Sequence, residues 1–250
     1  MLQAEQGSPL WWLQNLYPKL QERGKAIAKY EDYYDGRQPM AFATTKYREE
    51  FGRMLRDLCD NWMQLVVDAV EERLHVEGFR IGNNEAGDDA AWKIWQRNQL
   101  DSDSELTHSI ALITGWGPVM VWADETEKAA ITVEHPAQVL VAYESGTRRK
   151  RAAAIKVWID EWTGTPFANV YLPDGIHKFQ GPVPGAKVST SRQTTQTMLP
   201  NMGGSTHRAW SERAETVDNP LGVVPIVELL NRPKLIPVGS RQLLVVNLQG

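Results

Sequence analysis

The 250-residue sequence contains one cysteine, Cys59, and no long apolar run. A single cysteine cannot form a disulfide within the chain, so the predicted fold needs no oxidising compartment. The longest apolar stretches fall well short of about 18 residues, which excludes a membrane-spanning helix from the prediction. Residues 1–8 also lack the basic and then apolar pattern of a signal peptide. We therefore expect synthesis in the cytoplasm.

Sequence motifs that carry chemistry are also missing. Neither of the glycine-rich phosphate-binding patterns, G-x-x-x-x-G-K-[ST] and G-x-G-x-x-G, is present. The glycines of Gly115-Trp116-Gly117-Pro118 stand between a predicted helix and a predicted strand, whereas phosphate-binding loops lead from a strand into a helix. None of the five histidines has a second histidine, cysteine or carboxylate at metal-ligand spacing. We therefore predict no catalytic, cofactor-binding or metal-binding residues, and no enzyme.

Asp101-Ser102-Asp103 is the one acidic pair that resembles a divalent-cation site. The same residues stand where a helix begins, and negative charge is favourable at a helix N-terminus. Ser102 and Glu105 also have the spacing of a capping box. We interpret the group as the start of a helix that runs to Thr114.

Charge is unevenly distributed, although the formal net charge is only −4. Residues 1–147 hold 14 basic and 24 acidic side chains, whereas the rest holds 13 and 7. This imbalance is too weak to indicate nucleic-acid binding. The basic run Arg148–Arg151 lies between two predicted strands; we interpret it as a solvated hairpin tip, with phosphates or an acidic partner as the alternative.

Ten tryptophans are many for this length. Most fall at apolar positions of periodic segments, which indicates a core or a large interface, with a sugar-stacking platform as the alternative. Helical periodicity predicts a helix over residues 10–35, with Pro18 as its start or a kink, and a long helix from Tyr47 to Leu74. A short strand over residues 76–82 and a helix over residues 88–99 follow.

After Gly115 the period changes to two, which is typical of half-buried strands. Strands are predicted near residues 119–123, 131–133, 139–143, 154–159, 169–172 and 176–179, with a further pair at 208–217 and 223–230. The absence of helical crossovers predicts an antiparallel β-meander. The fold class is therefore α+β and elongated, with a mainly helical part, residues 1–115, and a β-rich part, residues 116–250.

Two further expectations concern the end of the sequence. Residues 181–206 are rich in Gly, Pro, Ser, Thr and Gln, which predicts a long mobile loop. Residues 241–250 begin an amphipathic segment without a cap or polar tail, which suggests a truncated chain.

Several separated blocks resemble the portal proteins of tailed bacteriophages, of the type found in siphophages of actinobacteria and in related Bacillus phages. They run in order through almost the whole sequence: Tyr30 to Gly36, Asn61 to Leu74, Val76 to Arg80, Ala90 to Gln99, Asn219 to Pro225, and Asn231 to Pro233. Gly239-Ser240-Arg241 departs from the family's Gly-Arg-Ser order by one displaced residue.

The resemblance implies a structural subunit of a homo-oligomeric ring, usually a dodecamer, at one capsid vertex of the virion. Such a ring docks the terminase and the head–tail connector, contacts capsid or scaffolding protein, and lets double-stranded DNA pass during packaging and ejection. The matched part is similar to the portal wing, so the chain would stop before the stem and clip. Assembly in the host cytoplasm without a membrane follows from the same resemblance.

Two other interpretations stay open from the residues. One is a different virion structural protein with the same architecture. The other is a glycan- or nucleotide-processing enzyme that uses the tryptophan-rich surface with Asp101 and Asp103.

Overall fold

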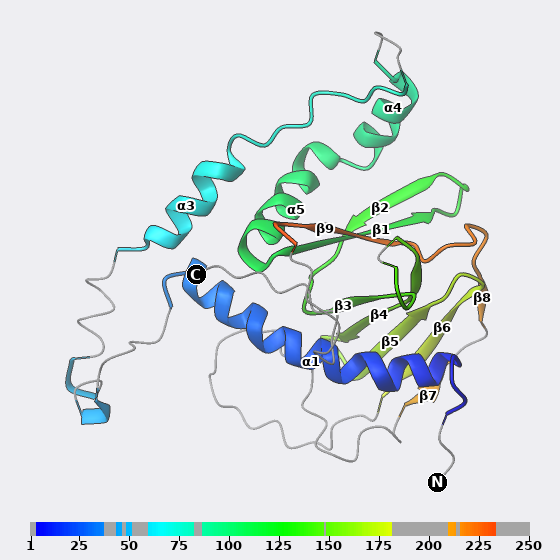
Figure 1. Ribbon diagram of the computed structural model, residues 1–250, viewed down its shortest axis with the longest axis horizontal. Helices are drawn as coiled ribbons and strands as arrows, with labels where there is room; N and C mark the ends of the chain where they lie inside the picture. The colour runs from blue at the N-terminus through cyan, green and yellow to red at the C-terminus, as the bar shows by residue number, and fades with distance from the viewer. Residues whose placement is uncertain are drawn as a thin grey trace. The chain divides into compact units, whose positions relative to one another are not determined.

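A computed structural model describes residues 4–37, 44–46, 49–51, 60–82, 87–147, 149–181, 210–213 and 216–233 (Figure 1). Helices come first: α1 (Pro9–Tyr34), α3 (Trp62–Glu71), α4 (Asp89–Arg97) and α5 (Leu100–Thr114). The strands follow: β1 (Trp116–Ala123), β2 (Ala129–Val133), β3 (Val139–Tyr143), β4 (Arg151–Ile159), β5 (Pro166–Tyr171), β6 (Gly175–Gln180), β7 (Ser211–Glu212), β8 (Val217–Asp218) and β9 (Ile226–Leu230). The predicted α+β class is confirmed. No helix in this part of the chain is long and apolar enough to cross a membrane.

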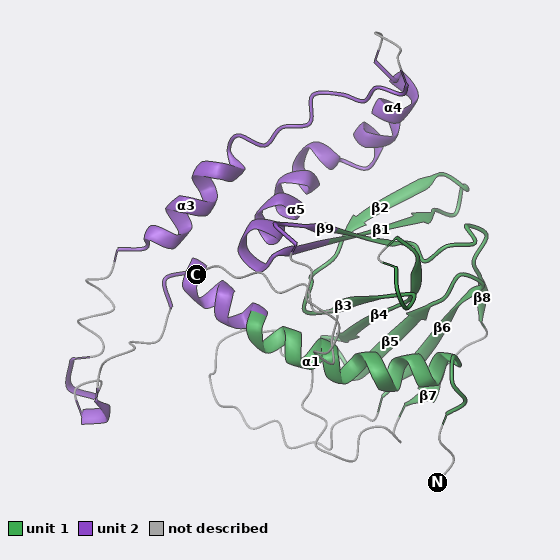
Figure 2. Cartoon of the chain, in the orientation of Figure 1, with its two compact units in different colours: residues 1–26, 118–228 green, residues 27–117, 229–250 purple. Residues whose placement is uncertain are grey.

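Two compact units share the chain (Figure 2). Unit one comprises residues 1–26 and 118–228, and unit two comprises residues 27–117 and 229–250. The boundaries fall inside α1, β1 and β9, so each unit is built from segments that are distant in sequence. The sequential division into parts 1–115 and 116–250 stays a prediction about domains.

Unit one is built around an antiparallel sheet of six strands in the order β3-β4-β5-β6-β7, with β8 beside β6. Strands β3 to β6 follow one another in sequence and in space, which confirms the predicted meander. Along β4, Ile155 pairs with Leu140 of β3 and with Val170 of β5. Because successive side chains of a strand point to opposite faces, this sheet has two faces to cover.

One face of the sheet is covered by α1. Leu13, Leu16 and Leu20 lie three and four residues apart, on one side of a helix, and all three are buried. They pack with Tyr17 against alternate sheet residues in one core, whose sheet members are Ala153, Ile155, Val157, Ala168, Val170, Leu172 and Phe179. Side chains on one face of α1 thus pack against every second residue of the strands.

The other face of the sheet packs against strands of a second sheet, which has the order β2-β1-β9. This core contains Val139 and Ala154 from the first sheet and Ile226 from β9, with Met120 and Trp122 of β1 packed against it. In β4, Ala154 therefore faces β9 and β1, whereas its neighbours Ala153 and Ile155 face α1. The apolar character on both faces of β4 follows from this double burial.

Gly115 and Gly117 form the turn from α5 to β1, in unit two. Gly115 ends the helix with φ 90°, a left-handed conformation that glycine adopts without strain. A Cβ at Gly117 would lie 2.8 Å from the carbonyl oxygen of Thr107, so only glycine allows the helix and strand to approach this closely. The predicted helix-to-strand turn is confirmed.

Several predicted element boundaries are wrong. The continuous helix from Tyr47 to Leu74 is interrupted, because Asn61 has ψ 74° and α3 begins only at Trp62; residues 52–59 lie outside the described residues. The long helix is instead α1, which runs for 26 residues with Pro18 in its interior rather than at its start. Pro18 is exposed, so the hydrogen bond that it cannot donate would be lost on the solvent side.

Three shorter predictions also fail. Residues 76–81 form no strand. Ser102 is not a helix cap, because α5 begins at Leu100 and Gln99 occupies the cap position. The predicted strand pair at 208–230 is not a hairpin, since β7 and β8 pair with β6 whereas β9 joins β1. The turn at Asn219–Gly222 itself is present, closed by the Gly222 N–H donating to the Asn219 carbonyl oxygen. The predicted loop at 181–206 falls, beyond Gly181, outside the described residues.

Three of the seven tyrosines are expected to ionise late in a titration with base. Burial raises the pKa of Tyr17, Tyr34 and Tyr171 to about 12, and hydrogen bonding to Asp68 adds to the effect at Tyr34. Because the folded pKa lies above the unfolded value of about 10, these groups stabilise the fold fully below pH 10, and this stability is lost as the pH rises toward 12.

Absorbance of tyrosinate at 295 nm measures this directly, with the urea-unfolded chain as control. The folded chain should titrate in two phases and the unfolded chain in one. A single phase near pH 10 from a chain that circular dichroism shows to be folded would contradict the assignment.

Candidate interaction surface

Helix α3, in unit two, exposes apolar side chains along one of its sides. None of its ten residues is buried. At 100° per residue, the exposed apolar side chains fall on one side of the helix, and the half-buried Val67, Asp68 and Glu71 fall on the other. The exposed set, called the α3 face below, consists of Trp62, Met63, Leu65, Val66 and Val70.

The α3 face is large for a single helix. Trp62 is 65% exposed and Val66 63% exposed. Together the five side chains present on the order of 500 Å² of apolar surface, comparable with the largest patch on a typical monomer. Helix α5 runs beside α3 (Figure 1), and the contacts between these two helices leave the α3 face uncovered.

Side chains at the end of α1 hold α3 in place. The Asn61 side chain accepts the Gln64 N–H and so caps α3, while its amide donates to the carbonyl oxygen of Tyr34 at 2.5 Å. The Tyr34 hydroxyl donates to the Asp68 carboxylate at 2.8 Å. The Tyr34–Asp68 hydrogen bond joins two regular helices, α1 and α3, and therefore helps to hold the α3 face in its exposed position within unit two.

An aromatic cluster stands next to α4 in the same unit. Trp92 and Trp95 are stacked, with ring centroids 6.2 Å apart, and Phe79 packs against both. Phe79, which belongs to the segment that was predicted as a strand, therefore packs against the tryptophans of α4. Both tryptophans are half-buried, and α4 has no fully buried residue.

Asp101 is occupied by this cluster. One carboxylate oxygen accepts the indole N–H of Trp95 at 2.7 Å, and the other accepts the side-chain amide of Gln96 at 2.9 Å. Asp101 and Asp103 lie in the first turn of α5, where the helix dipole favours negative charge. No group of three or more potential metal ligands occurs in the described ranges. The arrangement supports the interpretation as a helix start.

The basic run at the β3–β4 connection is only partly solvated. Arg151 belongs to β4 and donates to the carbonyl oxygen of Ile226 at 2.7 Å. Lys150 lies 3.8 Å from Glu144, and Arg149 is exposed. The hairpin-tip interpretation holds for Arg149 and Lys150, whereas Arg148 lies outside the described residues.

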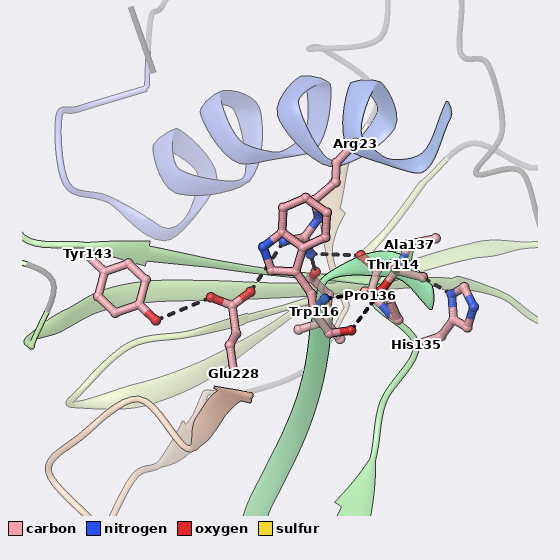
Figure 3. Close-up of polar contacts among 9 residues, drawn as sticks. Arg23, Thr114, Trp116, His135, Pro136, Ala137, Tyr143 and Glu228 are labelled. Atoms are coloured by element: carbon pink, nitrogen blue, oxygen red, sulfur yellow. Dashed lines mark hydrogen bonds and ion pairs between the residues drawn. The ribbon is translucent and has the colours of Figure 1, made fainter. Parts of the chain in front are cut away.

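A buried arginine joins four segments of unit one (Figure 3). Arg23 of α1 lies 3.3 Å from Glu228 of β9, and both side chains are 5% exposed. The same guanidinium donates to the carbonyl oxygen of Pro136 at 2.8 Å and to that of Val139. Tyr143 of β3 donates to the second oxygen of Glu228 at 3.3 Å.

Burial lowers the pKa of the Arg23 guanidinium from its ordinary value, and the charge of Glu228 opposes this shift. The charges and hydrogen bonds of Arg23 and Glu228 therefore join parts of the fold: helix α1, the β2–β3 connection and both sheets. The sequence pattern does not predict this centre, because a single arginine in an apolar helix stripe resembles a solvated residue. Its only signal was its place four residues before Ile27 and three after Leu20, in the buried stripe of α1.

The remaining candidates are the five histidines and Cys59. No contact of a described histidine indicates a catalytic or metal-binding role. His135 accepts the N–H of Ala137 at 3.2 Å within a turn, and His177 lies 3.1 Å from the Thr216 hydroxyl. His75 is exposed and His108 half-buried. Cys59 and His207 lie outside the described residues. The described geometry thus defines an α+β chain with an uncovered apolar helix face.

Comparison with known proteins specifies the class further. Residues 13–236 match the family described as phage portal protein, SPP1 Gp6-like. The portal protein of Mycobacterium phage L5 is 27% identical over 226 residues, which cover 86% of this chain and 40% of that protein. The portal protein of Mycobacterium phage D29 is 27% identical over 178 residues, 69% of this chain and 32% of that protein.

The chain therefore belongs to the SPP1 Gp6-like family of phage portal proteins, a structural family. The predicted resemblance to actinophage portals is confirmed by both relatives. The chain spans less than half the length of the curated relatives it matches.

Proposed function

We propose that this chain acts as a structural subunit of the portal ring at one vertex of a tailed-phage capsid. The observation that carries the proposal is the family match over residues 13–236. The matched residues include the whole of the six-stranded sheet and both cores of unit one. The part of the family fold that this chain spans therefore has hydrophobic cores of its own, as a structural subunit requires.

The α3 face supports assembly as the physical mechanism. Apolar surface of this size is stabilised when another protein surface excludes water from it. Identical subunits related by cyclic symmetry cover such surfaces on every neighbour and close the ring. By resemblance to the family, the proposed ring is a dodecamer in the virion, assembled in the host cytoplasm, and its proposed partners are terminase, capsid or scaffolding protein and the head–tail connector.

Double-stranded DNA would pass through this ring without sequence-specific contact. The formal net charge of −4 supports this part of the proposal, because tight non-specific binding to phosphates requires a strongly basic surface. The role is non-catalytic. The alternative enzyme would use Asp101 and Asp103, and both carboxylate oxygens of Asp101 are engaged by Trp95 and Gln96.

The mass of the purified chain in solution tests the proposal. Light scattering after gel filtration should show closed oligomers of the 28.2 kDa chain, and negative-stain microscopy should show rings. The reason is that a monomer would leave the α3 face in water. A chain that stays monomeric over a hundredfold range of concentration, and that hydrolyses a nucleotide or glycoside, would contradict the proposal.

A further inference from the structure

On the face of the six-stranded sheet that is turned away from α1, the second sheet covers only part of the surface. The covered part includes the row of Ala154, Tyr171 and Ile176, which pair across β4, β5 and β6 and share a core with Ile226 of β9. The next two rows of this face, toward the β4–β5 turn, are half-buried: Lys156–Asn169–Lys178 and Trp158–Phe167–Gln180. These two rows, together with Arg213, are called the β4–β6 patch below.

Basic side chains dominate the first row of the patch. The N–H of Arg213 donates to the carbonyl oxygen of Lys178 at 2.8 Å, so Arg213 extends this row by one strand. At the other end, Lys156 is neutralised by Glu134, whose carboxylate lies 2.8 Å from the lysine Nζ. Among the described residues, no carboxylate forms an ion pair with Lys178 or Arg213. Two cations of the patch therefore remain available to an external anion.

Aromatic rings of the second row support these cations. The guanidinium carbon of Arg213 lies 4.5 Å from the centre of the Phe167 ring. Phe167 in turn packs against Trp158, with ring centroids 5.8 Å apart. A guanidinium stacked on a ring keeps N–H donors at its edge, in a fork that fits both oxygens of a carboxylate. Because the ring already restricts the arginine side chain, less conformational entropy is lost when an anion binds.

We propose that the β4–β6 patch docks an acidic polypeptide segment of a partner protein. Charge complementarity carries the proposal, since Lys178 and Arg213 would bind carboxylates of the segment. The rings of Trp158 and Phe167 would pack against its apolar side chains. All of these residues belong to unit one of a single chain, so the proposal does not depend on ring formation.

A nucleic acid fits this patch less well than a polypeptide. With Lys156 neutralised, two cations remain, whereas tight non-specific binding to nucleic acid uses about 6–10 phosphate contacts. Asp160 and Glu161 directly follow β4, so phosphates that continued past Trp158 would meet charges of the same sign. A polypeptide avoids this repulsion, because its acidic residues can be followed by neutral ones.

Fluorescence anisotropy with two labelled probes tests the patch. One probe is a fluorescein-labelled decapeptide of alternating glutamate and leucine, and the other is a labelled strand of decathymidine. The wild-type chain should bind the peptide with a Kd below about 1 mM, and more tightly than it binds the strand. Raising the salt concentration from about 0.05 M to about 0.5 M should weaken peptide binding, because ions screen exposed charge pairs.

Variants locate the binding on the patch. Lys178→Gln combined with Arg213→Gln should weaken peptide binding about 10-fold, since two exposed ion pairs are lost. Arg149→Gln combined with Lys150→Gln is the matched control: it removes the same charge from the exposed β3–β4 connection and should change the Kd less than about 2-fold. Phe167→Leu leaves the charge unchanged but removes the ring that supports Arg213, so binding should weaken about 3-fold.

Circular dichroism checks that each variant is folded under the conditions of the titration. The proposal is overturned if the wild-type chain does not bind the peptide at millimolar concentration, if both double variants lose affinity equally, or if decathymidine binds more tightly than the peptide. Light scattering of the same samples reports on the ring separately. A wild-type monomer that binds the peptide through Lys178 and Arg213 would contradict the proposed function and support the docking surface.

Discussion

Replacing Glu228 by alanine is expected to lower the free energy of unfolding by about 3–5 kcal/mol. The substitution leaves the Arg23 guanidinium buried without its counter-charge, because the side chains of both residues are only 5% exposed. It also removes the acceptor of the Tyr143 hydroxyl. Urea unfolding followed by circular dichroism measures the loss as a lower midpoint with an unchanged slope.

The exposed pair Lys150–Glu144 provides the matched control. These side chains are 73% and 51% exposed and lie 3.8 Å apart, so Glu144→Ala should cost no more than about 1 kcal/mol. A double-mutant cycle with Arg23→Met isolates the coupling between Arg23 and Glu228. Equal losses of stability in Glu228→Ala and Glu144→Ala would show that the buried Arg23–Glu228 pair stabilises the fold no more than an exposed pair does.

The second large effect is expected from Leu20→Ala, with a loss of about 2–5 kcal/mol. Leu20 is completely buried between α1 and the six-stranded sheet, in the core that contains Ile155 and Val157. Truncation leaves a cavity there, because the strands on the opposite side are held by neighbours on both edges. Thermal unfolding by calorimetry measures the loss.

Lys19→Ala, one residue away on the exposed side of α1, is the control for helix propensity. Alanine is the best helix former, so this variant should be as stable as the wild type or slightly more stable. The prediction for Leu20 fails if the two alanine variants unfold at the same temperature, since the α1 core would then contribute little.

The apolar surface of α3 illustrates a limit of sequence patterns. The period of 3.6 residues correctly predicts helix over Trp62–Glu71. The same pattern is expected whether the apolar side faces the chain's own core or another protein, because periodicity reports that a face is apolar and not what covers it. The break at Asn61 was missed because an asparagine is also tolerated inside a helix. Its side chain caps α3 by accepting the Gln64 N–H, and its amide donates to the carbonyl oxygen of Tyr34, 27 residues away.

The two-residue period of β1 to β6 was predictable because each strand carries its pattern locally. Partner choice was not. Residues 223–230 were predicted to pair with the preceding strand, but Val224 and Ile226 are completely buried in the core that also includes Val139 and Ala154. The hydrogen bond from Val121 N–H to the Pro225 carbonyl oxygen connects this segment to β1, about a hundred residues earlier. Long-range pairing is decided by packing, for which a local pattern carries no signal.

By itself, the sequence determined the secondary structure of α1, α4 and β1 to β6, the α+β class and the portal resemblance, since each depends on local periods or on blocks read in order. Only the tertiary structure decided that Arg23 is buried against Glu228, that Asp101 is an acceptor for Trp95, and that the α3 face is uncovered. The physical reason is the same in all three cases. Burial and pairing belong to residues brought together from separate segments, and no single segment specifies its neighbour.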